Sequence, residues 1–132
     1  MVLVKFPTHW PVGCPPTAAV EANAVIYRVT KTNPATARDF QSQAELGRQR
    51  SANQCLRVGI SVFGSFRDVS HCQRVFPKLG RFIAQAALKP RHGKMQTTPS
   101  QMFPAHMTWW PYENVNRSEP FSVITSVEEE QH

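Results

Sequence analysis

Two short segments alternate apolar and polar side chains with the two-residue period of a β-strand. They cover residues 24–30 and 57–63, and each carries a polar residue within an otherwise apolar run: Arg28 in the first and Ser61 in the second. Packing gives no reason to place an arginine in the middle of a strand. We therefore expect Arg28 and Ser61 to face one cleft from neighbouring strands, where a guanidinium beside a hydroxyl group would suit a phosphate or nucleotide.

A helix is predicted at residues 34–46 from signals at both of its ends. Asn33 can accept hydrogen bonds from the first backbone amides, and Pro34 suits the first helical position because it has no amide hydrogen to lose. Gly47 suits the left-handed residue that follows a helix. The polar residues after it predict a loop beside the cleft.

A second helix is predicted at residues 66–76, because Ser65 and Asp68 have the spacing of a capping box and Pro77 stops the apolar pattern. Three further strands are predicted at 81–88, 105–110 and 120–127, with a helical turn at 17–22 and a long loop at 89–104.

This order of elements predicts an α+β fold with a mixed or antiparallel sheet of about five strands and two short helices. The 132 residues are enough for one hydrophobic core. We expect a single domain over residues 1–127, with a proline-rich N-terminal arm at 1–23 that Trp10 anchors and an acidic tail at 128–132.

Positive charge is concentrated in the middle of the chain. Residues 28–94 contain thirteen Lys and Arg but only Asp39, Glu45 and Asp68 as acids, whereas residues 95–132 carry a net negative charge. Such a basic segment favours phosphate-bearing partners, nucleic acids or an acidic protein surface.

Composition argues against several classes of protein. No apolar run is long enough to span a membrane and no signal peptide is recognisable, so we expect a soluble, cytoplasmic protein. The three cysteines, Cys14, Cys55 and Cys72, are widely spaced and lack a Cys-x-x-Cys pair. They are expected to be buried thiols rather than disulfides or zinc ligands, and His71 and His92 are expected to be exposed.

The segment 106–110 offers further candidate chemistry. As a strand it would place His106, Thr108 and Trp110 on one side. His106 is a candidate general acid or base, and Trp110 could stack on a flat ring such as adenine or nicotinamide.

Three short motifs resemble the arginine-serine-glutamate branch of the bacterial ADP-ribosyltransferase-like domains. They are Tyr27-Arg28, the segment 59–63 (Gly-Ile-Ser-Val-Phe) and the segment 80–84 (Gly-Arg-Phe-Ile-Ala). The chain also resembles uncharacterised small bacterial or phage proteins. The first resemblance implies that NAD is the cofactor, that Arg28 holds its pyrophosphate, that Ser61 braces the ribose next to nicotinamide, and that Tyr27 or Trp110 stacks on a ring. It implies a toxin or defence role.

The chain departs from that family at two points. Ile60-Ser61-Val62 stands where the family has a Ser-Thr-Ser triplet, and the family's catalytic Glu-x-Glu or Gln-x-Glu pattern has no convincing counterpart, although Glu128-Glu129-Glu130 has the spacing. Glu113 and Glu119 are the candidates for the catalytic carboxylate. Without it the protein would bind NAD but not transfer ADP-ribose.

Two alternatives are open. The first is a nucleic-acid-binding accessory protein, and the second is an antitoxin-type or immunity-type protein that binds an acidic partner. Both would use the basic side chains of Arg48, Arg50, Arg57, Arg67, Arg74, Lys78, Arg81, Lys89, Arg91 and Lys94.

Overall fold

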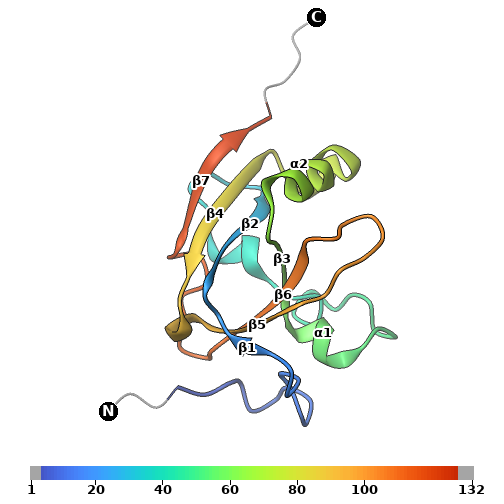
Figure 1. Ribbon diagram of the computed structural model, residues 1–132, viewed down its shortest axis with the longest axis vertical. Helices are drawn as coiled ribbons and strands as arrows, with labels where there is room; N and C mark the ends of the chain where they lie inside the picture. Colours follow the sequence, from blue (N-terminus) through green and yellow to red (C-terminus); the bar gives the residue numbers. More distant parts are fainter. Residues whose placement is uncertain (1–3, 128–132) are drawn as a thin grey trace, which may run out of the picture.

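A single antiparallel sheet of seven strands organises the computed structural model, which describes residues 4–127 (Figure 1). The order across the sheet is β1-β5-β6-β3-β2-β4-β7. The strands are β1 (Val20–Glu21), β2 (Ala24–Thr30), β3 (Ile60–Phe63), β4 (Phe82–Leu88), β5 (Gly93–Thr97), β6 (His106–Pro111) and β7 (Phe121–Ser126). The helices are α1 (Gln54–Val58) and α2 (Phe66–Val75), with short 3-10 helices η1 (Ala37–Phe40), η2 (Pro77–Leu79) and η3 (Pro90–His92). The α+β class is confirmed, but the sheet has seven strands rather than about five.

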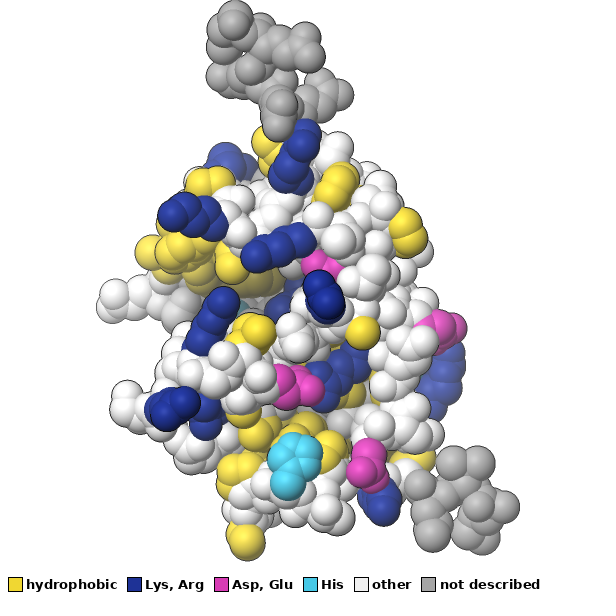
Figure 2. Space-filling model, turned by 180° about the vertical axis from the view of Figure 1, so that it is seen from behind, with side chains coloured by type: hydrophobic (Ala, Val, Ile, Leu, Met, Phe, Trp, Pro, Cys, Tyr) yellow, Lys and Arg dark blue, Asp and Glu magenta, His cyan; other side chains and the backbone are white. Residues whose placement is uncertain are grey.

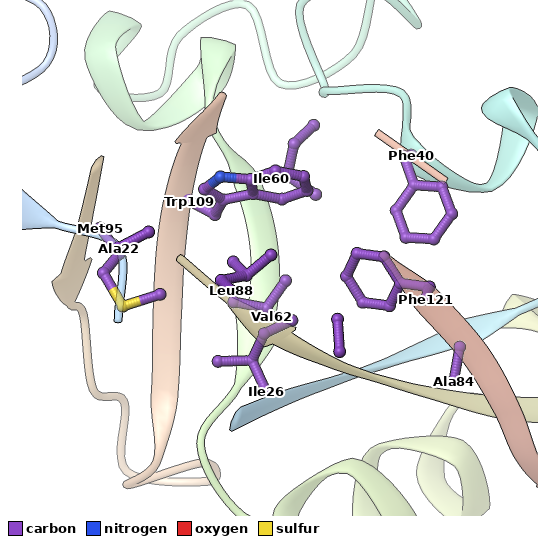
Figure 3. Close-up of a cluster of buried hydrophobic side chains, with 11 residues drawn as sticks. Ala22, Ile26, Phe40, Ile60, Val62, Ala84, Leu88, Met95, Trp109 and Phe121 are labelled. Atoms are coloured by element: carbon purple, nitrogen blue, oxygen red, sulfur yellow. The ribbon is translucent and has the colours of Figure 1, made fainter. Parts of the chain in front are cut away.

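One face of the sheet carries the main hydrophobic core (Figure 3). Alternate residues of the strands point to this face, so that Ile26 of β2, Val62 of β3 and Trp109 of β6 meet there. Phe40 of η1 closes one side of the core and packs against Phe121, with ring centroids 4.4 Å apart and the two ring planes tilted by 38°. This core fixes the register of the strands and therefore the position of the residues on the other face.

The opposite face is covered in two separate places. At one end α2 packs Val69 and Cys72 against Val29 and Phe63. At the other end the N-terminal arm and α1 bury Trp110 together with residues that include Trp10, Ala19 and Val58. Trp10 therefore does anchor the arm, as expected.

The predicted helix at 34–46 is wrong. Only η1 forms there, because the Asp39 side chain is turned inward and accepts hydrogen bonds from the Lys31 and Thr36 amides and the Thr32 hydroxyl. Gly47 does adopt the expected left-handed φ, +69°, but it follows a turn.

The second strand is shorter than predicted, since residues 57–59 belong to α1 and the end of that helix. The predicted loop at 89–104 contains η3 and β5, and the predicted helical turn at 17–22 contains the two-residue strand β1, which pairs with β5. His92 is buried rather than exposed, and its Nδ1 accepts a hydrogen bond from the Lys89 amide. The acidic tail lies outside the described residues.

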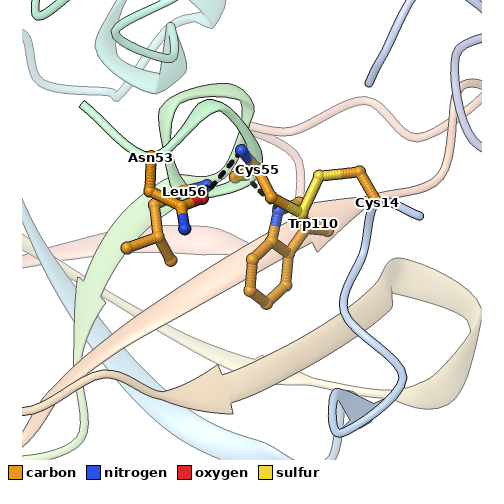
Figure 4. The surroundings of a disulfide bond; sticks show 5 residues. All are labelled: Cys14, Asn53, Cys55, Leu56 and Trp110. Carbon is orange, nitrogen blue, oxygen red and sulfur yellow. Dashed lines mark hydrogen bonds between the residues drawn. A yellow bond between two sulfur atoms is a disulfide. The ribbon is translucent and has the colours of Figure 1, made fainter. Parts of the chain in front are cut away.

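Cys14 and Cys55 form a disulfide, which corrects the prediction of three thiols (Figure 4). The arm lies against α1, so the Cα atoms of the two cysteines are 5.4 Å apart, well within disulfide range, despite a sequence separation of 41. The indole nitrogen of Trp110 donates to the Cys55 carbonyl oxygen at 2.9 Å and fixes the same point. Cys72 is a free, buried thiol whose pKa is raised by burial.

Among residues 4–127, no helix has both the length and the apolar character that crossing a bilayer demands.

Candidate functional site

A polar strip crosses the sheet face between the two apolar covers. Ser61 of β3 lies directly opposite Thr108 of β6, and His106 of β6 lies opposite Phe63. His106, Thr108 and Trp110 therefore share one face, as predicted. Gly59 keeps this strip open, because a side-chain carbon at that position would overlap Cγ2 of Thr108 and come within 3.0 Å of the Trp110 indole nitrogen.

A cavity of about 350 Å³ lies over this strip. Its floor includes Ser61, Thr108 and His106, and Arg28 and Thr98 also line it. Its wall comes from residues 41–57, which comprise the segment before α1 and most of α1 itself. The structure thus brings the predicted pair, Arg28 and Ser61, together at one cavity.

Arg28 lies where β2 and β3 separate. β2 pairs with β4 along its full length, but with β3 it shares the single registered pair Tyr27 and Phe63. The guanidinium fills the gap: its Nη1 donates to the backbone oxygen of Ser61 at 2.6 Å and its Nε donates to that of Asp39 at 2.7 Å. Arg28 therefore meets the main chain of Ser61 and not its hydroxyl group.

The charge of Arg28 is held in an unusual environment. Burial lowers the pKa of its guanidinium to about 10, while Asp39 acts in the opposite direction, so the group remains charged at neutral pH. The guanidinium also lies over the Phe40 ring, 5.7 Å from its centroid. Neither oxygen that it contacts is charged, and within residues 4–127 its Nη2 has no hydrogen-bond partner.

Arg57 of α1 is held in the same way on the cavity wall. Its Nε donates to the Arg48 backbone oxygen at 2.7 Å and its Nη1 to the Gln54 side-chain oxygen at 3.3 Å. Its Nη2 also has no hydrogen-bond partner among the described residues. The cavity is consequently lined by two guanidinium groups whose orientation is fixed by uncharged oxygen atoms.

His106 is neutral and its tautomer is defined by its partners. Its Nδ1 lies 2.9 Å from the Thr98 carbonyl oxygen, which can only accept, so Nδ1 carries the hydrogen. The Thr98 hydroxyl continues the network to that of Thr108 at 2.9 Å. Burial lowers the pKa of His106, and this effect exceeds that of the hydrogen bond to Thr98, which raises the pKa. Nε2 is thus the ring nitrogen left as a hydrogen-bond acceptor, and His106 lines the cavity.

The wall at residues 41–45 is fixed from outside the cavity. Ser42 and Glu45 cap each other, and Arg117 joins Glu45 at 2.6 Å while it also donates to the Phe40 carbonyl oxygen. Burial alone would raise the pKa of Glu45, but the bonds from Ser42 and Arg117 hold it below its ordinary value. These contacts hold Gln41, Ser42 and Gln43 at the cavity.

Two predicted ring-binding residues do not line the cavity. Trp110 is fully buried beneath α1, and Tyr27 packs edge-on against Phe66 and accepts a hydrogen bond from Gln85. No Phe, Tyr or Trp side chain lines the cavity within the described part of the chain.

The carboxylate candidates also lie elsewhere. Glu113 is exposed and paired with Lys5 at 3.5 Å, and Glu119 is exposed. Neither lines the cavity, and no other Asp or Glu of residues 4–127 does so. The terminal glutamates lie outside the described residues.

Sequence reasoning missed most of the cavity wall. Gln41, Gln43 and Gln49 lie in the predicted helix and the loop after it, and Thr98 lies in the predicted long loop. These four residues share only a polar, uncharged side chain. Many other residues of the chain have such a side chain, so this property does not indicate a site. Arg57 was identified only as one basic residue among many.

No family model, curated protein or solved structure matches this chain. No cluster of three or more His, Cys, Asp and Glu side chains that could hold a metal ion occurs in residues 4–127. The function is therefore inferred from the geometry of the cavity.

Proposed function

We propose that this protein binds a phosphate-bearing nucleotide of the NAD type in the cavity between α1 and the polar strip of the sheet. The observation that carries the proposal is the pair of fixed guanidinium groups, Arg28 and Arg57, on a cavity lined by no carboxylate of the described residues. Holding a half-buried guanidinium group against uncharged oxygen atoms is costly, and an anionic ligand relieves that cost. Preorganised guanidinium groups also lose little entropy when they bind phosphate.

Binding without transfer is the form that the cavity favours. Transfer of ADP-ribose needs a carboxylate to orient the nucleophile and to stabilise an oxocarbenium-like state. Glu113 and Glu119 lie away from the guanidinium pair, so we propose a degenerate, binding-only relative of the ADP-ribosyltransferase-like type. His106 offers an acceptor at Nε2, which alone does not replace that carboxylate.

Thermal unfolding with added NAD tests the proposal. NAD at 100 times its Kd would stabilise the folded state by about 2.7 kcal/mol and raise Tm by several degrees. Arg57→Ala should weaken NAD binding about tenfold or more, because hydrogen bonds to charged groups are worth about 1.5–3 kcal/mol. Arg67→Ala removes the same charge from an exposed site on α2 and should leave affinity unchanged.

Two results would contradict the proposal: no thermal shift at millimolar NAD, or equal loss of affinity in Arg57→Ala and Arg67→Ala. Arg57→Lys keeps the charge but not the fork, so an intermediate affinity would show that geometry matters. Release of nicotinamide from NAD, above that of an Arg28→Lys variant, would overturn the binding-only form.

Nucleic-acid binding is the second candidate, and surface charge favours it. Eight of the ten basic residues proposed for it are exposed, whereas Arg57 and Lys94 are half-buried. Figure 2 shows Lys and Arg side chains spread over most of one face rather than gathered in a single stripe. Affinity for random DNA or RNA that falls steeply with salt would support this candidate. Affinity that is absent or independent of salt would remove it.

A further inference from the structure

Side chains with amide or hydroxyl groups are the largest class in the lining of the cavity, beside the two guanidinium groups. Three glutamines line the cavity: Gln41 and Gln49, which are exposed, and Gln43, which is half-buried. Their side chains have no hydrogen-bond partner among the described residues. Each primary amide offers two donors and one acceptor. Ala52 and Leu56 are the only residues of the described chain that contribute apolar side chains to the lining.

This lining suits one part of a nucleotide better than the other. A nucleobase is held best by stacking on a large aromatic or other flat apolar face, and no Phe, Tyr or Trp side chain of the described residues lines the cavity. A sugar presents several hydroxyl groups, each both donor and acceptor, which match primary amides and the hydroxyl of Ser61. The phosphate matches the guanidinium groups.

The size of the cavity agrees with this division. About 350 Å³ lies near the lower limit of ligand pockets, which begin at about 300 Å³. A single sugar phosphate is a more suitable occupant than a whole dinucleotide.

We infer that the cavity recognises the ribose phosphate unit of its ligand and leaves the base outside. This inference rests on the proposed function and specifies the substrate class of the same site. Arg28 and Arg57 hold the phosphate, and the glutamine amides hold the ribose hydroxyl groups.

Calorimetric titration with four compounds tests the inference: ADP-ribose, ribose 5-phosphate, inorganic phosphate and adenosine. The Kd of ribose 5-phosphate should lie within about tenfold of the Kd of ADP-ribose. Inorganic phosphate should bind at least about tenfold more weakly than ribose 5-phosphate, and adenosine should not bind. Gln41→Met keeps the side-chain length but removes the amide. It should weaken ribose 5-phosphate about five- to tenfold and leave inorganic phosphate unchanged. Gln101→Met changes an exposed glutamine away from the cavity and should have no effect.

The outcomes separate the two proposals. Saturable adenosine binding, or ribose 5-phosphate no tighter than inorganic phosphate, would overturn the ribose phosphate inference and leave nucleotide binding in place. An unchanged ribose 5-phosphate affinity in both Gln41→Met and a Gln43→Met variant would overturn it too. Absence of binding by all three phosphate compounds would overturn the proposed function itself.

Discussion

Removing the disulfide should destabilise the protein by an amount that follows from its place in the chain. Cys14 and Cys55 are separated by 41 residues, and the chain-entropy model assigns a loop of that length about 4 kcal/mol at 25 °C. The double variant Cys14→Ser/Cys55→Ser should therefore unfold at lower urea concentration, with a loss of up to about 4 kcal/mol and a Tm lower by roughly 10–20 °C. The effect should include the cavity, because Cys55 belongs to α1, which forms part of its wall.

Equilibrium unfolding in urea measures this loss, with and without reductant. Reductant should destabilise the wild type by the same amount and leave the double variant unchanged, which separates the bond from the cost of the serines. Thiol titration of the unfolded, unreduced chain should find one reactive group, Cys72. The chain-entropy model assigns the bond about 4 kcal/mol, so a loss of unfolding free energy below about 1 kcal/mol would refute the reasoning. Three reactive thiols in the unfolded, unreduced chain would also refute it.

Two further changes test the packing and the electrostatics beside the cavity. Gly59→Ala should lower the free energy of unfolding in urea by about 1–3 kcal/mol, because its new carbon overlaps Thr108. Gly64→Ala, whose new carbon would lie 3.3 Å from Met107, should lower it clearly less. Equal losses in the two variants would contradict the close approach at Gly59. Burial alone would raise the pKa of Asp39, but the hydrogen bonds from Thr32, Thr36 and Lys31 lower it from the ordinary value of 3.8. The ionised carboxylate therefore stabilises the folded protein above pH 3.8, and this stabilisation is lost as the pH falls through the pKa of the folded state. Asp39→Asn should therefore be less stable than the wild type at pH 7, with the difference narrowing towards pH 3 in urea unfolding; a constant difference would contradict the assignment.

Local signals predicted those elements whose residues face one environment along their length. β2 has the predicted bounds, because its apolar residues alternate between the main core, where Ile26 lies, and the cluster beneath α2, where Val29 lies. The start of α2 was also readable, since the Ser65 hydroxyl accepts from the Asp68 amide at 3.1 Å. The Asp68 carboxylate, however, accepts from the Ala105 amide, a contact between distant segments.

The elements that failed are those decided by distant contacts. Residues 34–46 do not form the predicted helix. In its place the Asp39 side chain accepts a hydrogen bond from the Lys31 amide, and Phe40 packs on Phe121. The disulfide depends on where the arm lies, which no spacing of cysteines reveals. Of the candidate site, the sequence could indicate Arg28, Ser61 and His106 because they break or end strand patterns. The glutamine wall has no pattern of its own and becomes a site only through the path of residues 41–57.

The most direct test of the guanidinium pair is to observe both groups while a phosphate ligand binds. The Nε–H groups of Arg28 and Arg57 each donate to a backbone oxygen at 2.7 Å, which should protect them from exchange and make them visible by ¹⁵N NMR. On titration with ADP-ribose, we expect both signals to shift with one saturable dependence, while the signal of the exposed Arg67 stays in place. Unchanged Arg28 and Arg57 signals, or a gradual and unsaturated shift of all arginines, would contradict a phosphate site in this cavity.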